Sequence, residues 1–197
     1  MCIHARQQKF RGVHKIRHAS DYPEEVPTSP FLHPNLADRH EMTRIKSMKI
    51  ALAADHAGYE EKEHVKATLH ELGVDFEDFG TVSTESVDYP DYAKKVGEAV
   101  AKGEVDSGLL VCGSGTGMAI AANKVPGVRA AVAWNEEIAR LAREHNNANV
   151  LSLAARYTSP EENEKIIRAW FGASFEAGRH QRRVDKISEI EQEERSK

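Results

Sequence analysis

The sequence predicts a three-layer α/β/α sandwich built on a five-stranded parallel sheet, with an additional C-terminal helix. Two observations lead to this prediction. Short apolar segments, typical of strands buried on both faces, alternate along the chain with longer segments of helical period. Connections of this kind are right-handed crossovers, which produce a parallel sheet with helices on both sides.

The predicted strands are short and mainly apolar. The first, residues 48–55, is almost continuously apolar and ends in a polar residue, as expected of a strand inside a parallel sheet. Similar segments follow at residues 74–79, 107–112, 128–134 and 150–154.

Helical segments separate these strands and follow the last one, at residues 59–72, 89–102, 116–124, 135–145 and 159–171. In the first, Val65 and Leu69 have helical spacing, and Gly73 ends the helix. The last begins with a capping box, Ser159 and Glu162, and has proline at its first helical position. The alternation is therefore Rossmann-like.

The two ends of the chain differ from the middle. Residues 1–47 contain four of the seven prolines and five of the ten histidines, without a sustained period. We therefore expect a disordered extension, an upstream-start artefact or a cloning remnant there, with the domain spanning 48–197. From about Arg179 onward a helical segment carries Val184, Ile187 and Ile190 as a narrow apolar stripe, suited to packing on this domain or on a second subunit.

Composition narrows the class of protein. The net charge is −4, and residues 48–197 hold 19 basic and 26 acidic residues, so nothing favours a nucleic-acid partner. Only two cysteines occur, which excludes a disulfide framework and indicates the cytoplasm. The sequence has no apolar run long enough to span a membrane and no cysteine and histidine pattern typical of zinc.

Ligands of open α/β sheets bind beyond the carboxyl ends of the strands. The first predicted strand ends in DHAG (55–58), and the third ends in CGSGTG (112–117). Glycine amides and a helix N-terminus favour an anion, although a tight structural turn explains the glycines equally well. No Gly-Lys pair occurs, which excludes a Walker A loop, and GxGxG departs from the dinucleotide pattern GxGxxG, which leaves a nicotinamide cofactor as a weaker interpretation.

Cys112 directly precedes the glycine loop. A lone cysteine is most often a small buried apolar residue. Before a helix N-terminus, however, the thiol pKa is expected to fall below its usual value, so that the thiolate acts as a base or as a nucleophile. A nucleophile would need a histidine partner, for which His56 and His145 are candidates.

Other polar residues have structural and functional interpretations. Arg179 and Arg183 are four residues apart, which predicts a shared helix face that either binds phosphate or is simply solvated. His145 and the asparagines after it suit a helix C-terminus. Asp55 and Asp88 suit helix N-caps.

Five segments together resemble ribose-5-phosphate isomerase type B: DHAG (55–58), SVDYPDYA (86–93), CGSGTGMAIAANK (112–124), HNNANVLSLAAR (145–156) and GRHQRRV (178–184). The resemblance extends from Met48 to about Gln192. It implies an aldose-ketose isomerase of the pentose phosphate pathway, without metal or cofactor, that interconverts D-ribose 5-phosphate and D-ribulose 5-phosphate. The sugar ring would open and the reaction would pass through a cis-enediolate. The site would be assembled at a homodimer interface, in a dimer or a tetramer.

The resemblance also implies roles for single residues. Cys112 would be the base, and His145, with Asp55 nearby, would be the acid that opens the sugar ring. Ser114 and the loop amides of Gly113, Gly115, Thr116 and Gly117 would hold the developing oxyanion. The remaining matched positions would bind the sugar or its phosphate, or lie near it: His56, Asn146, Arg156, Arg179, Arg183 and Tyr89.

Two residues depart from the pattern of some relatives, and two kinds of alternative function stay open at this level. Met118 stands where some relatives have a glutamate base, and methionine cannot accept a proton, which favours the cysteine branch. Ser114 replaces the threonine of some relatives and retains the hydroxyl. The alternative substrates are allose 6-phosphate and galactose 6-phosphate, and the alternative of another class is a non-catalytic phosphosugar or nucleotide-binding module.

Overall fold

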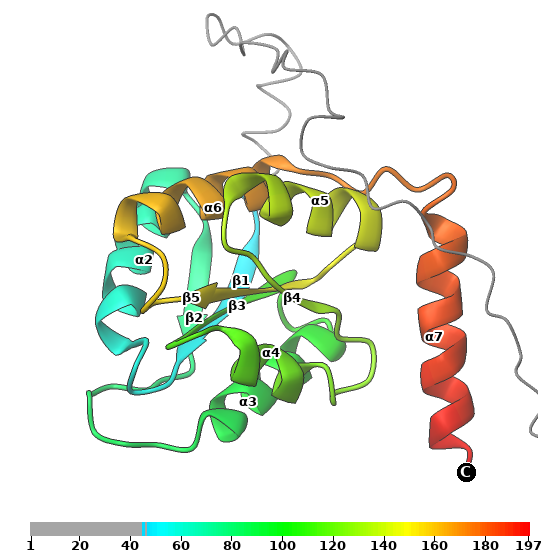
Figure 1. Ribbon diagram of the computed structural model, residues 1–197, viewed down its shortest axis with the longest axis horizontal. Helices are drawn as coiled ribbons and strands as arrows, with labels where there is room; N and C mark the ends of the chain where they lie inside the picture. Colours follow the sequence, from blue (N-terminus) through cyan, green and yellow to red (C-terminus); the bar gives the residue numbers. More distant parts are fainter. Residues whose placement is uncertain (1–44, 46) are drawn as a thin grey trace, which may run out of the picture. The chain divides into compact units, whose positions relative to one another are not determined.

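A five-stranded parallel sheet forms the middle layer of the structure (Figure 1). Its strands are β1 (Lys49–Ala54), β2 (Asp75–Asp78), β3 (Ser107–Cys112), β4 (Ala130–Val132) and β5 (Val150–Ala154), in the order β2-β1-β3-β5-β4. The computed structural model describes residue 45 and residues 47–197. The expectation for residues 1–47 therefore lies almost entirely outside the described residues.

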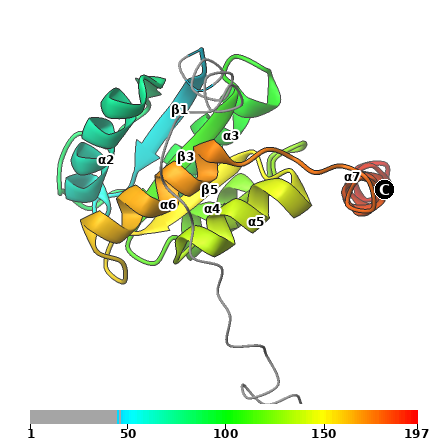
Figure 2. The ribbon, with the colours of Figure 1, turned by 90° about the horizontal axis from the view of Figure 1, so that it is seen from above.

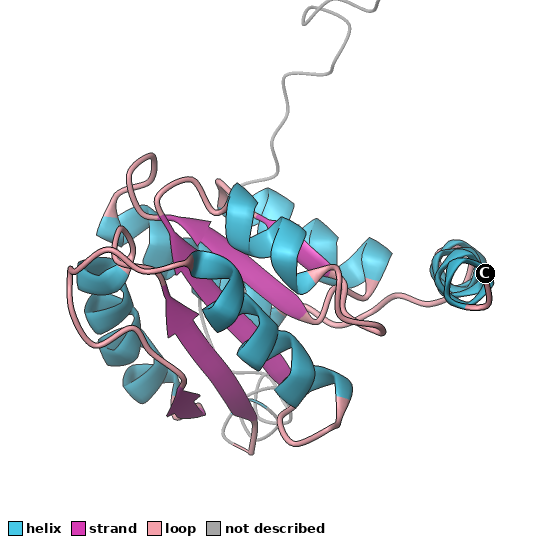
Figure 3. Cartoon of the chain, turned by 90° about the horizontal axis from the view of Figure 1, so that it is seen from below, coloured by secondary structure: helices cyan, strands magenta, loops and turns pink. Residues whose placement is uncertain are grey.

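Helices cover both faces of the sheet. One face carries α2 (Tyr59–Leu72), α5 (Glu136–Asn146) and α6 (Pro160–Gly172), and the other carries α3 (Tyr89–Ala101) and α4 (Thr116–Ala122). Figure 3 shows the strands between the two helical layers. The predicted α/β/α sandwich is thereby confirmed. The last helix, α7 (Gln181–Arg195), lies beside the sandwich and belongs to neither layer (Figure 2).

Alternate side chains of each central strand enter separate cores. Leu109 and Val111 of β3 pack in the core under α2, α5 and α6, whereas Leu110 and Cys112 pack in the core under α3 and α4. Every residue of β3 is buried. This two-sided burial explains why the central strands are continuously apolar in the sequence instead of alternating.

The predicted boundaries fit best in the centre of the sheet. The strand predicted at 107–112 and the helix predicted at 59–72 have the observed bounds, and Gly73 ends α2 in the left-handed conformation. At the sheet edge, β4 has only three residues, against the seven predicted, and it pairs with β5 alone. An edge strand has one neighbour to extend its ladder, so pattern alone overestimates its length.

Two of the three predicted N-caps, Ser159 and Asp88, occupy the N-cap position of their helix, whereas Asp55 does not. Ser159 caps α6 as predicted, because its Oγ accepts a hydrogen bond from the amide of Glu162 at 3.2 Å. Asp88 precedes α3, but its side chain accepts no capping hydrogen bond from the described backbone. The cap position of α2 belongs to Gly58, and Asp55 instead accepts a hydrogen bond from the Gly58 amide at 2.9 Å within the preceding turn.

None of the helices in residues 47–197 combines the length and the apolar character that crossing a membrane requires.

Among the described glycines, Gly58 leaves the least room for a Cβ. A Cβ at this position would lie 2.3 Å from the carbonyl oxygen of Val111, although the φ of −102° suits any residue. We expect Gly58→Ala to lower the free energy of unfolding by about 3 kcal/mol, because β3 must move away. Gly172→Ala is the control, since a Cβ there would meet nothing within 4 Å apart from its chain neighbours and the backbone of its own helix. Equal unfolding midpoints in urea for both variants would contradict this steric account.

Candidate active site

A pocket of about 460 Å³ lies at the carboxyl edge of the sheet. Because β1, β3 and β5 are parallel neighbours, the segments that follow them meet at this edge. The structure thus brings eight of the sequence-predicted residues together in the pocket lining, which Ala57 and Tyr157 complete: Asp55, His56, Tyr89, Cys112, Gly113, Ser114, Gly117 and Arg156.

Cys112 and Asp55 form the buried centre of this pocket. The thiol donates a hydrogen bond from Sγ to Oδ2 of Asp55 at 3.1 Å. The other carboxylate oxygen accepts the amide of Gly58, and the amide of Asp55 donates to the carbonyl of Val111 at 3.2 Å. Asp55 is 4% exposed, so the carboxylate is fixed in place and directed at the thiol.

The expectation of a lowered thiol pKa is wrong for this structure. Burial raises the pKa of Cys112, and the neighbouring Asp55 carboxylate raises it further. The amides of Ser114 and Gly115 act in the opposite direction, as a helix N-terminus does, but they do not outweigh these two effects. The thiol is therefore protonated at neutral pH, with two amides positioned to stabilise the thiolate after the proton leaves.

The glycine loop holds these amides rigidly. Gly115 is left-handed, with φ 73°, and its carbonyl accepts a hydrogen bond from Ser152 Oγ at 2.7 Å. Thr116 begins α4, and its hydroxyl donates to the carbonyl of Ser114 at 3.4 Å. A side chain at Gly115 would meet both this backbone strain and the carbonyl of Leu153 at 3.1 Å.

His56 and Tyr89 form one wall of the pocket. The amide of Val87 donates to Nδ1 of His56 at 3.3 Å. Nδ1 is thus the acceptor, so the neutral ring carries its hydrogen on Nε2, which makes Nε2 a donor. The ring of Tyr89 packs over Gly117, where an added Cβ would lie 2.9 Å from it.

Arg156 stands on the opposite wall, in the turn after β5. Its amide donates to the carbonyl of Gly113 at 3.0 Å, which attaches this turn to the glycine loop. The turn is also attached to α6 and α2, because Thr158 contacts Asn163 at 2.7 Å and Asn163 donates to the buried Glu61 at 2.8 Å. The position of this arginine therefore depends on three separate elements.

The other predicted residues lie elsewhere in the chain. His145 and Asn146 end α5, which returns from the carboxyl edge of the sheet to the amino edge before β5 begins. The carbonyl of Asn146 accepts a hydrogen bond from Arg129 Nε at 3.2 Å, next to β4. Five residues of β5, roughly 16 Å, separate this end from the turn of Arg156.

Arg179 and Arg183 accompany His145 and do not share a helix face. The helix α7 begins only at Gln181, so Arg179 lies in the turn before it and the predicted helical pairing is wrong. The ring of His180 stacks on that of His145, with centroids 4.1 Å apart and planes 5° apart. Burial lowers the pKa of His180, and the neighbouring His145, Arg179 and Arg183 lower it further. The neutral form of His180 is therefore favoured.

These histidines and Glu176 form the one cluster in the described residues with ligand atoms near enough for a metal, all within 4.8 Å of one another. Parallel stacked rings direct their in-plane lone pairs side by side, so they do not converge on one ion. Arg179 Nε also donates to Nε2 of His180 at 3.1 Å. The donor set therefore fits a metal poorly.

A further pocket, of about 690 Å³, lies between α7 and the amino edge of the sheet, where Asn146 lines it. Of the predicted apolar stripe, Val184 is 6% exposed, whereas Ile187 and Ile190 are 46% and 60% exposed and line this pocket. The stripe therefore packs only partly within its own chain.

Comparison with known proteins gives a consistent result. Residues 50–187 match the model of the Ribose/Galactose Isomerase family. The chain belongs to this family. It is 49% identical to the ribose-5-phosphate isomerase B of Escherichia coli (strain K12) over 144 residues, which are 73% of this chain and 97% of that protein.

Solved structures agree with this membership. The ribose-5-phosphate isomerase B of Clostridium thermocellum superposes with a TM-score of 0.73 at 49% identity, covering 74% of this chain and 99% of that one. The Mycoplasma genitalium enzyme, solved with bound ribulose-5-phosphate, gives a TM-score of 0.72 at 44% identity, covering 75% of this chain and 98% of that one.

The effect of Asp55 on the thiol can be measured by alkylation. In a Cys2→Ser background, we expect the rate at which iodoacetamide modifies Cys112 to rise steadily from pH 7 to above about pH 9, because the thiol pKa is raised. Asp55→Asn removes the negative charge, so the rate at pH 7 should increase roughly tenfold. Asp88→Asn makes the same charge change at an exposed carboxylate and serves as control. A rate that does not change in Asp55→Asn would contradict the assigned cause.

Proposed function

We propose that this chain interconverts D-ribose 5-phosphate and D-ribulose 5-phosphate, with residues 48–197 as the isomerase domain. The observation that carries the proposal is the buried Cys112 thiol between Asp55 and the amides of a glycine loop. Membership of the family and the relative with bound ribulose-5-phosphate support the substrate. The two cysteines in 197 residues and a phosphorylated substrate support a cytoplasmic location.

In the proposed reaction, Cys112 first passes its thiol proton along the hydrogen bond to Asp55, and the thiolate then removes the proton from C2 of the open-chain aldose. The electron pair of that C–H bond forms the C1=C2 double bond, and the carbonyl pair moves onto O1 to give the enediolate. A proton then passes from the C2 hydroxyl to O1, and the sulfur returns its proton to C1 as the C2=O bond of the ketose forms. A proton beside a carbonyl is weakly acidic, so the developing oxyanion needs fixed donors. The amides of the loop from Gly113 to Gly117 and the Ser114 hydroxyl are suited to that role.

The walls of the pocket suit a phosphorylated sugar. Nε2 of His56 is available as a donor, and Arg156 supplies a guanidinium on the opposite wall. Tyr89 closes the side next to Gly117. These groups would orient the substrate over the sulfur, using binding energy remote from the reacting carbons.

We further propose that a second copy of the chain completes the site, as a homodimer or within a tetramer. His145, Asn146, Arg179 and Arg183 lie at the amino edge of the sheet, away from their own Cys112. Exposed apolar side chains lie after the strands at the carboxyl edge, where Trp134 and Tyr157 are 59% and 79% exposed. A partner that covered these side chains could bring its own histidine and arginines to the pocket, His145 then opening the ring as the acid.

The central test is turnover of ribose 5-phosphate without added metal. We expect Cys112→Ala to lower kcat by about a thousandfold while ribulose 5-phosphate still binds, because the base is lost. Cys112→Ser, which keeps a hydrogen bond donor for Asp55 but has a far less acidic group, should be similarly impaired. If the wild-type protein converts allose 6-phosphate or galactose 6-phosphate and not ribose 5-phosphate, the proposed substrate is wrong. If it binds any of these sugar phosphates without converting it, a non-catalytic module is favoured.

The shared site can be tested with hybrid dimers. Cys112→Ala and His145→Ala chains, each inactive alone, should recover about a quarter of the wild-type activity when co-expressed, because half of the dimers then hold one intact site. Differently tagged chains allow the hybrids to be isolated. Pure hybrids that remain as inactive as either parent would contradict a site shared between subunits.

A further inference from the structure

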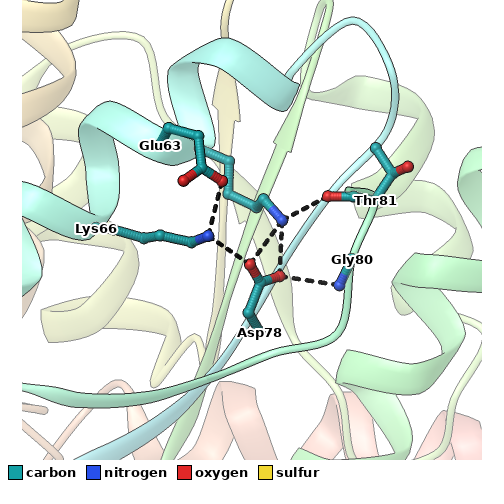
Figure 4. A network of polar contacts seen from close by, with 6 residues as sticks. Glu63, Lys66, Asp78, Gly80 and Thr81 are labelled. Atoms are coloured by element: carbon teal, nitrogen blue, oxygen red, sulfur yellow. Dashed lines mark hydrogen bonds and ion pairs between the residues drawn. The ribbon is translucent and has the colours of Figure 1, made fainter. Parts of the chain in front are cut away.

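Lys62, in the first turns of α2, is a fully buried lysine outside the pocket. Its side chain is 1% exposed. Nζ donates to both oxygens of Asp78 at 2.7 Å and to the carbonyl of Thr81 at 2.6 Å (Figure 4). The ring of Tyr59 lies 5.8 Å from the same nitrogen. All three donors of the ammonium therefore have acceptors, as a buried charge requires.

Asp78, at the end of β2, is the other centre of this network. Burial by itself would raise its pKa, but Lys62, Lys66 and the amide of Gly80 outweigh burial and lower it. Lys66 lies nearer the surface and contacts Asp78 and Glu63 at 2.7 Å each (Figure 4). The carboxylate is thus shared between two lysines, of which Lys62 is the one that also holds the Thr81 carbonyl.

The network fixes the chain next to the end of β1. Gly80 accepts a hydrogen bond from the amide of Ala54 at 2.7 Å, and the amide of Thr81 donates back to Ala54 at 2.8 Å. Ala54 directly precedes Asp55 of the pocket. The contact of Lys62 with Thr81 therefore fixes the starting point of residues 82–88.

Residues 82–88 lead from this anchor to the pocket wall. Val82 is 83% exposed, so it adds no buried apolar anchor to the segment. At the far end, Val87 donates its amide to Nδ1 of His56, and Tyr89 begins α3 over Gly117. The position of that amide depends on where the segment starts.

We propose that Lys62 is a positioning residue, which through Asp78 and Thr81 holds residues 82–88 so that Val87 fixes the tautomer of His56. The importance of that tautomer for substrate rests on the proposed function. With Nδ1 occupied by the Val87 amide, His56 offers Nε2–H to the pocket. Without the anchor, the ring exchanges between both tautomers and loses its orientation.

The test compares Lys62→Met with Lys66→Met. Both replace a lysine that contacts Asp78 by an unbranched apolar side chain, but Lys62 alone of the two holds Thr81. In Lys62→Met we expect the ¹⁵N shifts of the His56 ring to change from the Nε2–H tautomer to a mixture. We also expect KM for ribose 5-phosphate to rise about tenfold with a smaller change in kcat, because substrate binding loses an oriented donor. Lys66→Met should leave both quantities near wild type.

Two results of this comparison would contradict the positioning role of Lys62. Unchanged His56 shifts and KM in a folded Lys62→Met protein would overturn the proposal, and so would equal effects of both substitutions. If Lys62→Met does not fold, Asp78→Asn takes its place, because it keeps an oxygen for Lys62 but removes the charge that holds it. Wild-type protein without turnover would refute the proposed function only, since the ¹⁵N shifts still test the positioning.

Discussion

The parallel pairing of β1 with β3 is the interaction on which the rest of the site depends. Ala54 lies opposite Val111 in this register. The residues that follow them, Asp55 and Cys112, are therefore neighbours as well. Gly58 permits the close approach, because a Cβ there would lie 2.3 Å from the Val111 carbonyl. A shift of the register by one residue would exchange the faces of the strand and move Cys112 out of its core.

This pairing also determines the electrostatics of the thiol. A cysteine facing only the amides of a helix N-terminus would have a lowered pKa, whereas burial of the Cys112 thiol, together with the neighbouring Asp55 carboxylate, raises the pKa here. In the resting site the sulfur therefore keeps its proton, which it donates in a hydrogen bond to the Asp55 carboxylate. The amides of Ser114 and Gly115 matter after that proton has left, because they favour the negative sulfur.

The first turns of α2 connect the two walls of the pocket. Glu61 reaches the turn of Arg156 through Asn163, and its neighbour Lys62 reaches the segment after β2 through Asp78. Both side chains are buried, so neither network is strongly screened by solvent. One helix, fixed by Gly58 against β3, thus holds both walls relative to the thiol.

The sequence by itself determined the layers, the central strands and the residues at the strand ends, because burial on two faces leaves a continuous apolar pattern and glycines mark the turns. It also singled out Cys112 and the glycine loop.

The sequence could not predict the strand order, the raised thiol pKa or the start of α7 after Arg179. The burial of Lys62 and Glu61 was not predicted, because charged residues in an amphipathic helix usually face solvent. The one signal for it in the sequence is that Lys62 shares a helical face with apolar residues. Only the tertiary structure decided these points, because a pKa or a buried ion pair depends on groups distant in the chain, such as Asp55 and Cys112, 57 residues apart.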